Sequence, residues 1–96
     1  MIVLAVRYQG HKGRGDEIAE AMREMVALAR EEDGCELYLV ARSTEDPDVF
    51  VLHEHYRDEQ SFDAHLQTEH FKRIVEGRVV PMLESRVRER AEPVEP

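Results

Sequence analysis

The chain has 96 residues, a formal net charge of −8 at pH 7 and one cysteine, Cys35. A chain of this length forms one small domain, and its acidic surface argues against nucleic acids and anionic membranes as partners, because both bind basic surfaces. One cysteine cannot form an intrachain disulfide, and no apolar run is long enough for a membrane span or follows a basic leader, so we expect a cytoplasmic protein.

The first half of the chain predicts two strands joined by a helix. Residues 2–8 are rich in β-branched and apolar side chains on both faces, which is typical of a central strand. After a loop at residues 10–15, apolar residues recur at helical spacing through residues 16–32 and predict an amphipathic helix. Gly34 is placed to end this helix, and the alternating residues 35–42 predict the second strand.

A third strand, residues 49–57, follows a polar turn at residues 43–48, and the second and third strands are expected to form a hairpin. Alternation along the third strand separates two faces. One face carries Phe50, Leu52, Glu54 and Tyr56, and the other carries Val49, Val51, His53 and His55. The first face therefore combines core residues with ionisable groups.

Two short helices are predicted next. Asp58 can cap the first helix by accepting hydrogen bonds from free backbone N–H groups, and Thr68 can cap the second, which ends near Gly77. The apolar positions are Phe62, His65 and Leu66 on the first helix, and Phe71, Ile74 and Val75 on the second. His65 is thus the polar member of an otherwise apolar helix face.

The last part of the chain predicts an irregular turn at residues 79–83, a fourth strand at residues 84–90 and a flexible tail at residues 91–96. The order βαββαβ predicts a single α+β domain, residues 1–90, with a ferredoxin-like sandwich in which helices cover one face of an antiparallel sheet. The other face carries Val3, Val49 and Val51. Because such a face is poorly tolerated in water, we expect two subunits to pack their sheets together as a homodimer.

Glu54 and His65 are the strongest candidates for chemistry. Glu54 points towards the helices, where a carboxylate needs a partner or has a raised pKa, and His65 faces it from the helix above. In a functional interpretation Glu54 orients His65, and His65 removes a proton from a substrate. The alternative interpretation is a buried polar pair that only fixes the packing of strand and helix. Sequence spacing leaves both open.

Other polar residues give weaker signals. Tyr56 either borders a flat pocket or donates a hydrogen bond there, or is a half-buried strand tyrosine. His70 either contacts a ligand, caps the short helix or faces water. His53 and His55 have a spacing that can bind a metal, but no further ligands are apparent, so interface histidines are the favoured interpretation and no metal is expected. The chain lacks the common zinc, serine-nucleophile and nucleotide-binding motifs.

Three segments resemble the antibiotic biosynthesis monooxygenase domain. They are GCELY at residues 34–38, FVLHEHY at residues 50–56 and FDAHLQTEHF at residues 62–71. The likeness extends over nearly all of residues 1–90, and its most specific part is Glu-x-Tyr followed by His-x-x-Thr-x-His-Phe. Function varies widely within one fold, so the resemblance is stronger evidence for fold than for activity.

The resemblance implies a homodimeric α+β barrel that oxidises quinols or polycyclic phenols with molecular oxygen, without flavin, haem or metal. The residues carried over to the pocket are His65 and Glu54 as catalytic groups and Tyr56, His70, Phe62, Leu52 and Phe71 as substrate contacts. A phenol with a pKa of about 10 is protonated at neutral pH, and a histidine held by a carboxylate can remove its proton. The resulting anion is electron-rich enough to reduce oxygen itself.

The haem-degrading branch of the family carries a tryptophan on the helix where His65 stands and an axial histidine further along. This chain has neither a tryptophan nor a histidine after Phe71, so haem degradation is not expected. Two alternatives accompany the monooxygenase expectation. Relatives that isomerise substrates or degrade signalling molecules are not excluded by the sequence. The competing class is a non-enzymatic dimeric module that binds a small hydrophobic ligand or only assembles.

Overall fold

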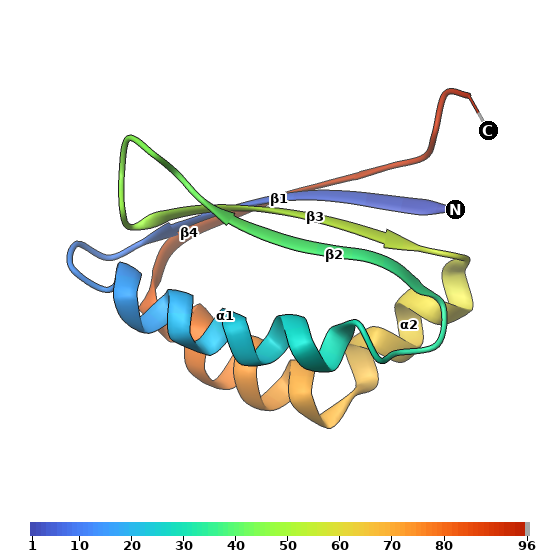
Figure 1. The fold of residues 1–96 in the computed structure, drawn as a ribbon, viewed down its shortest axis with the longest axis horizontal. Helices are drawn as coiled ribbons and strands as arrows, with labels where there is room; N and C mark the ends of the chain where they lie inside the picture. The colour runs from blue at the N-terminus through green and yellow to red at the C-terminus, as the bar shows by residue number, and fades with distance from the viewer. Residues whose placement is uncertain (96) are drawn as a thin grey trace.

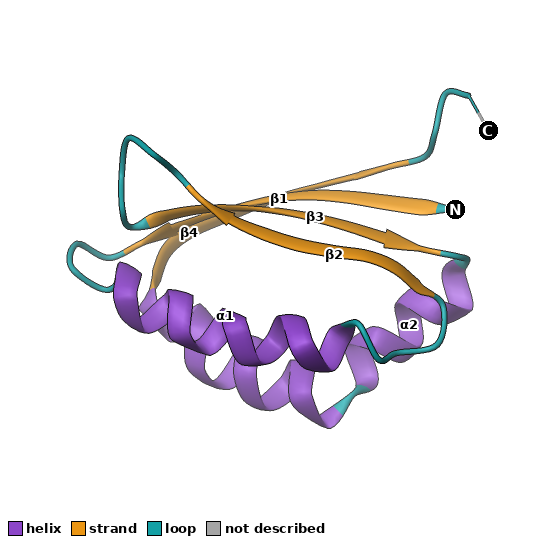
Figure 2. Ribbon diagram, in the orientation of Figure 1, coloured by secondary structure: helices purple, strands orange, loops and turns teal. Residues whose placement is uncertain are grey.

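The computed structural model describes residues 1–95. It shows a four-stranded antiparallel sheet with all helices on one face (Figures 1 and 2). The strands are β1 (Ile2–Gly10), β2 (Cys35–Arg42), β3 (Val49–Tyr56) and β4 (Leu83–Ala91), in the order β2-β3-β1-β4. The helices are α1 (Gly15–Ala29), α2 (Glu59–Gln67), a π-helix η1 (Phe71–Val79) and a 3-10 turn η2 (Val80–Met82). The predicted ferredoxin-like α+β fold is therefore confirmed.

The core lies between the sheet and the helices because each element turns one apolar face to that layer. Ile18, Met22 and Met25 of α1 are almost completely buried, as the helical spacing predicted. Phe50 and Leu52 of β3 pack against this layer with exposed fractions of 2% and 0%, on the strand face that alternation predicted. The register of β3 is fixed by its pairing with both β1 and β2.

The helix that follows Thr68 is longer than predicted. It was expected to end near Gly77 and to be followed by an irregular turn, but η1 continues to Val79 and η2 follows directly. Val79 is fully buried, and the backbone N–H of Val80 donates to the carbonyl of Val75, an i to i−5 bond. Burial of an apolar side chain here outweighs the low helix propensity of glycine. Conversely, α1 ends at Ala29, three residues before its predicted end.

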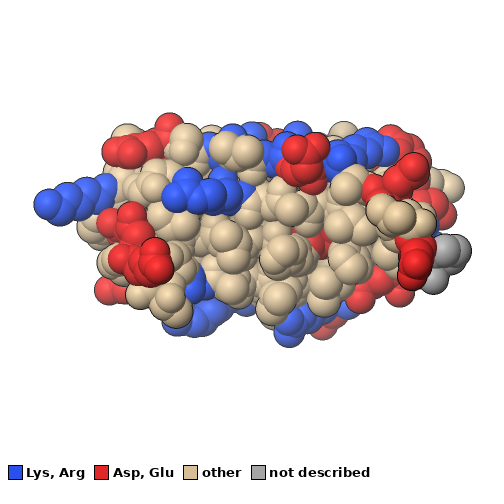
Figure 3. All heavy atoms as spheres, turned by 90° about the horizontal axis from the view of Figure 1, so that it is seen from above, with Lys and Arg blue, Asp and Glu red and all other residues tan. Residues whose placement is uncertain are grey.

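The outer face of the sheet is uncovered and apolar at its centre. Figure 3 looks onto this face, where uncharged side chains fill the middle and charged ones lie around them. Leu37, Leu39, Val51 and Val87 are 36–61% exposed here. Val49 was predicted to lie on this outer face, but it is buried. It lies beside the β2–β3 turn, where its N–H donates to the carbonyl of Asp46.

The last strand lies at the edge of the sheet and is exposed along most of its length. Ala91, predicted to belong to the tail, pairs with Val3 and so belongs to β4. The flexibility of the remaining tail stays a prediction, and its final residue, Pro96, lies outside the described residues. No helix within residues 1–95 has the length and apolar composition needed to cross a membrane.

Candidate active site

Glu54 on β3 and His65 on α2 meet between the sheet and the helix. Their exposed fractions are 6% and 1%. Nε2 of His65 lies 3.8 Å from Oε1 of Glu54, which is close enough for electrostatic contact but too far for a hydrogen bond. The Tyr56 hydroxyl donates to that same oxygen at 2.7 Å. The structure thus brings these three predicted residues together, but it makes Tyr56 the hydrogen-bond partner of Glu54.

A different carboxylate, Glu32, holds the histidines. Nδ1 of His65 lies 2.8 and 3.0 Å from the two oxygens of Glu32, and Nε2 of His70 lies 2.6 Å from Oε2. The sequence prediction that Glu54 orients His65 is therefore corrected, since Glu32 makes the hydrogen bond. In the sequence, Glu32 is the last residue of the helix predicted at residues 16–32, and nothing there marks it as a partner of His65. Only the packing of the α1–β2 connection against α2 brings it to the imidazole.

The two carboxyl groups of this site have pKa values shifted in opposite directions. Burial raises the pKa of Glu32, but hydrogen bonds from His65 and His70 outweigh it, and the pKa lies below its ordinary value. Burial also raises the pKa of Glu54, and the hydrogen bond from Tyr56 and the nearby His65 do not offset it. One carboxylate therefore stays ionised while ionisation of the other is disfavoured, a separation that enzymes use to assign acid and base roles.

Replacing Glu54 by glutamine is expected to stabilise the fold at neutral pH. Because the folded pKa of Glu54 is raised above the ordinary 4.5, its contribution to stability is complete below pH 4.5 and is lost as pH rises through the folded pKa. The glutamine carries no charge, and its amide oxygen still accepts from Tyr56. Urea denaturation between pH 4.5 and 8 should show the E54Q advantage growing with pH. A constant difference across this range would contradict the expectation.

Aromatic rings surround the imidazole of His65. The ring centroids of Tyr38, Tyr56 and Phe71 lie 5.8, 5.0 and 5.1 Å from that of His65. Burial, followed by the nearby Glu54, raises the pKa of both tyrosines, so their hydroxyls stay protonated at neutral pH. This packing leaves the imidazole little freedom to rotate, as a positioned base requires.

An inner cavity of about 20 Å³ lies beside His65, between the sheet and the helices. Its polar lining residues are Tyr8, Tyr38, Glu54, His65, Arg86 and Arg88, and its apolar ones are Leu4, Val6, Phe62, Leu66 and Phe71. A cavity of this volume holds about one water molecule. An aromatic substrate therefore enters only if the surrounding side chains or helices move apart.

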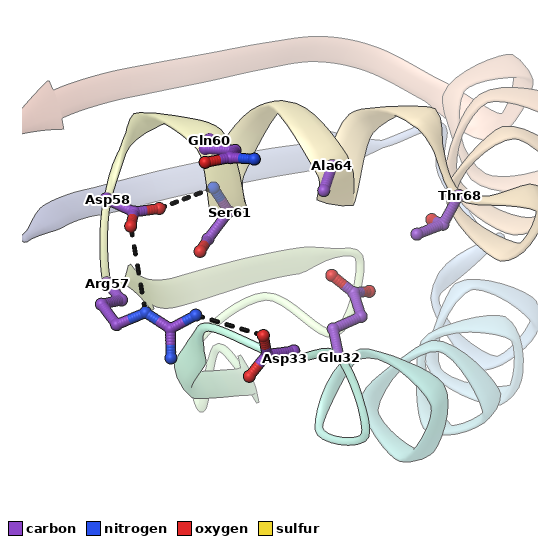
Figure 4. A pocket seen from close by; sticks show the side chains of 8 residues that line it. All are labelled: Glu32, Asp33, Arg57, Asp58, Gln60, Ser61, Ala64 and Thr68. Atoms are coloured by element: carbon purple, nitrogen blue, oxygen red, sulfur yellow. Dashed lines mark hydrogen bonds and ion pairs between the residues drawn. The ribbon is translucent and has the colours of Figure 1, made fainter.

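A larger outer pocket of about 430 Å³ lies on the other side of Glu32 (Figure 4). Figure 4 shows Glu32 pointing into the space between the α1–β2 connection and α2. At the far end of the pocket Arg57 donates to Asp33 at 3.2 Å, and Asp58 caps α2 by accepting from the N–H of Ser61 at 2.8 Å. Glu32 and His65 thus form part of the wall between a solvent-accessible pocket and the inner cavity.

The structure distributes the remaining predicted site residues differently. Phe62 and Phe71 line the inner cavity, but Leu52, Tyr56 and His70 do not. Leu52 is fully buried in the core, and the imidazole of His70 is hydrogen-bonded to Glu32. Four polar lining residues were not among the site residues predicted from the sequence: Tyr8, Tyr38, Arg86 and Arg88. Alternation along their strands was the available signal, since each sits on the helix-facing side.

Two further observations concern the other histidines and possible metal ligands. His53 and His55 lie on the outer side of β3, opposite Glu54, and take no part in the His65 site. Within residues 1–95, no group of three or more His, Cys, Asp and Glu side chains is arranged to hold a metal ion.

Gly34 allows the α1–β2 connection to approach α2. Its φ is +85°, a left-handed conformation that favours glycine, and a Cβ there would overlap Oγ and Cβ of Ser61. The carbonyl of Gly34 also accepts from the N–H of Arg57 at 2.8 Å. This close approach brings Glu32, two residues earlier, within reach of His65.

Replacing Gly34 by alanine is expected to destabilise the fold by about 1–3 kcal/mol, from backbone strain together with the overlap at Ser61. Gly13 provides a matched control because it has the same φ of +85°, but a Cβ added to it would meet nothing within 4 Å. Urea denaturation should therefore show a smaller loss in G13A than in G34A. Equal losses would mean that contact with Ser61 adds nothing.

Comparison with known proteins identifies relatives of this fold and site. The profile of the antibiotic biosynthesis monooxygenase family matches residues 1–77. A solved antibiotic biosynthesis monooxygenase is 25% identical, with a TM-score of 0.91 over 99% of this chain and 100% of the other. A Bacteroides thetaiotaomicron protein described as a possible oxidoreductase is 27% identical, with a TM-score of 0.88 and 96% coverage of both chains.

A third solved structure, PA3566 from Pseudomonas aeruginosa, shares the fold at 24% identity, with a TM-score of 0.89 over 98% of this chain and 94% of the other. No curated protein sequence matches the chain. The family match covers most of the chain and includes β1, the α1–β2 connection with Glu32, β3 and the helix of His65. This chain therefore belongs to the antibiotic biosynthesis monooxygenase family.

Proposed function

We propose that this protein is a monooxygenase that oxidises a quinol or polycyclic phenol with molecular oxygen, without an organic cofactor or metal, and that His65 is its base. The observation that carries the proposal is the placement of His65. Its Nδ1 lies against the Glu32 carboxylate, and its Nε2 lies on the side of Glu54, which also lines the inner cavity. A buried imidazole held in this way can accept a proton from a ligand in that cavity.

Glu32 acts as a positioning residue in this mechanism. By accepting the Nδ1–H hydrogen bond, its carboxylate favours the tautomer in which Nε2 carries a lone pair. It also stabilises the imidazolium that forms when Nε2 takes the proton. Glu54 lies on the other side of the imidazole ring, 3.8 Å from Nε2, and burial raises its pKa. It therefore does not compete with Glu32 for the Nδ1 proton.

The reaction balances without an external reductant. His65 removes a phenolic proton, and the electron-rich anion transfers electrons to oxygen. One oxygen atom enters the product and the other leaves as water, so the substrate supplies all four electrons. The proton on His65 and the proton lost from the oxygenated ring carbon leave with the departing oxygen as water. The protein contributes a base, orientation and an apolar environment.

Oxygen uptake with a panel of naphthohydroquinones tests this function. We expect uptake faster than the uncatalysed autoxidation of the same quinol, and incorporation of one atom from ¹⁸O₂ into the product by mass spectrometry. Boiled protein is the control for trace metals and autoxidation. Rates equal to the uncatalysed reaction over the whole panel would refute the proposal.

A second candidate function is a non-enzymatic dimeric module that binds a small hydrophobic ligand or only assembles. The inner cavity favours the assembly role, because at about 20 Å³ the site is nearly closed and Glu32, His65 and His70 satisfy one another. In that case the cluster is a structural connection between α2 and the α1–β2 connection. The oxygen-uptake experiment separates the two candidates, since a binding module gives ligand-dependent stabilisation without quinol turnover.

We further propose that two copies form a homodimer through the outer face of the sheet. Leu39 on β2 and Val87 on β4 are 43% and 61% exposed on this face, and a second sheet packed against it would remove them from water. Burial of a lysine there is unfavourable. L39K/V87K should therefore elute as a monomer in size-exclusion chromatography with light scattering, whereas wild type has twice the chain mass. A monomeric wild type would contradict this proposal.

A further inference from the structure

The edge strand β4 places two arginines at the inner cavity. Arg86 is paired in register with Tyr8, and Arg88 with Val6. Tyr8 and Val6 are buried towards the helices, and cross-strand partners project to the same side of a sheet. Both arginines accordingly line the cavity that contains Glu54 and His65. Their backbone belongs to an exposed strand, so the guanidinium groups lie where the cavity meets solvent.

Neither arginine has a carboxylate partner within residues 1–95, in contrast to Arg90 on the same side of β4. Arg90 forms an ion pair with Glu59 and lies over the ring of Phe62, 5.6 Å from its centroid. Arg14, Arg42, Arg57, Arg73 and Arg78 also form ion pairs with acidic side chains. Arg7, Arg23 and Arg30 likewise form no ion pair within the described residues, but none of them lines the inner cavity. Arg86 interacts with the Tyr8 side chain, and neither cavity arginine has a carboxylate partner there although a net charge of −8 makes acidic side chains abundant.

The positive charges of these arginines affect the pKa values of two groups that line the cavity. Burial and the nearby Glu54 raise the pKa of Tyr8, and Arg86 and Arg88 act against that shift. Burial raises the pKa of Glu54, which Arg88 also opposes. Within residues 1–95 Glu54 forms no ion pair with either arginine, and its carboxyl group accepts a hydrogen bond from Tyr56. A negative group on a ligand would supply the counter-charge that the two guanidinium groups lack.

We propose that Arg86 and Arg88 form an anion-binding subsite, and that the ligand of the inner cavity is a hydroxyaromatic carboxylate. The apolar wall of Leu4, Phe62 and Phe71 suits an aromatic body, His65 faces its hydroxyl group, and the guanidinium groups hold its carboxylate at the β4 rim. Guanidinium groups bind carboxylates in a planar, bidentate geometry. This inference rests on the proposed function for the role of His65, but it concerns binding and requires no turnover.

The test uses two redox-stable fluorescent probes of nearly equal shape, 1-hydroxy-2-naphthoate and 1-hydroxy-2-naphthamide. Wild-type protein should bind the naphthoate about tenfold more tightly, a difference of about 1.4 kcal/mol. In R86Q/R88Q the two affinities should agree within about twofold, while naphthamide binding is unchanged. The control R23Q/R78Q removes the same charge from exposed helix positions and should keep the tenfold preference.

Each result decides the proposal. Equal binding of both probes to wild type would overturn it whether or not the variants fold, and so would a preference that survives in R86Q/R88Q or disappears in R23Q/R78Q. Circular dichroism checks that the variants fold, and single R86Q and R88Q variants replace the double variant if it does not. Failure of quinol oxidation with a retained carboxylate preference would reject the monooxygenase proposal and leave the anion subsite standing. Quinol oxidation without a carboxylate preference would reject only the subsite.

Discussion

Replacing His65 by glutamine is expected to lower the rate of quinol oxidation by about 10²- to 10⁴-fold, the range that a positioned general base contributes. Glutamine keeps a polar group of similar length, but it cannot accept and return a proton near neutral pH. The measurement is oxygen uptake at saturating quinol, with substrate affinity determined separately under anaerobic conditions. Binding should change little, because the substituted group acts on the transition state.

The control for this experiment is H11Q. His11 lies on the loop after β1, its side chain is 54% exposed, and its Nδ1 lies 3.7 Å from Oε1 of Glu84 near the surface. H11Q should therefore oxidise the quinol at the wild-type rate. If H65Q retained the wild-type rate while remaining folded, His65 would not be the base, and the buried cluster would have a structural role.

Replacing Glu32 by glutamine is expected to lower the same rate by about 10²-fold, because the variant loses the acceptor that fixes the His65 tautomer and stabilises its protonated form. One carboxylate serves both His65 and His70, whereas an amide oxygen accepts less strongly and its NH₂ group donates. A loss of fold stability alone would not change the tautomer of His65 in the folded protein. Nitrogen-15 NMR of the imidazole should therefore show Nδ1–H of His65 in wild type and a mixture in E32Q.

E31Q is a matched control, because it removes the same charge from the neighbouring exposed position. E31Q should have wild-type activity and an unchanged imidazole spectrum. An E32Q variant with both properties unchanged would remove Glu32 from the mechanism.

Glu32 also predicts a pH dependence of stability opposite to that of Glu54. The folded pKa of Glu32 lies below its ordinary 4.5, so its stabilising contribution is present above pH 4.5 and is lost as pH falls through the folded pKa. Wild type should therefore exceed E32Q in unfolding free energy at neutral pH, and this gap should close in acid.

Much of the fold follows from the sequence for simple reasons. Helical spacing in α1 and alternation in β3 each bury one apolar face, and these local patterns do not depend on distant residues. The βαββαβ order then leaves few possible arrangements. The same alternation placed Glu54 towards the helices, and helical spacing did the same for His65, so their proximity was predictable.

The remaining parts of the site required the tertiary structure. Glu32 and His70 lie 38 residues apart, and no periodic pattern relates them. Their contact depends on Gly34, whose missing side chain lets one connection approach α2. The end of η1 was missed because burial of Val79 overrode the local preference of Gly77.

The sequence by itself determined which strand and helix faces are apolar, and hence the sandwich and the inward positions of one acid and one imidazole. Only the tertiary structure decided which carboxylate binds that imidazole and which arginines reach the cavity. The physical reason is that apolar burial follows local periodicity, whereas a hydrogen bond between distant segments depends on the relative position of whole elements to within a few tenths of an ångström.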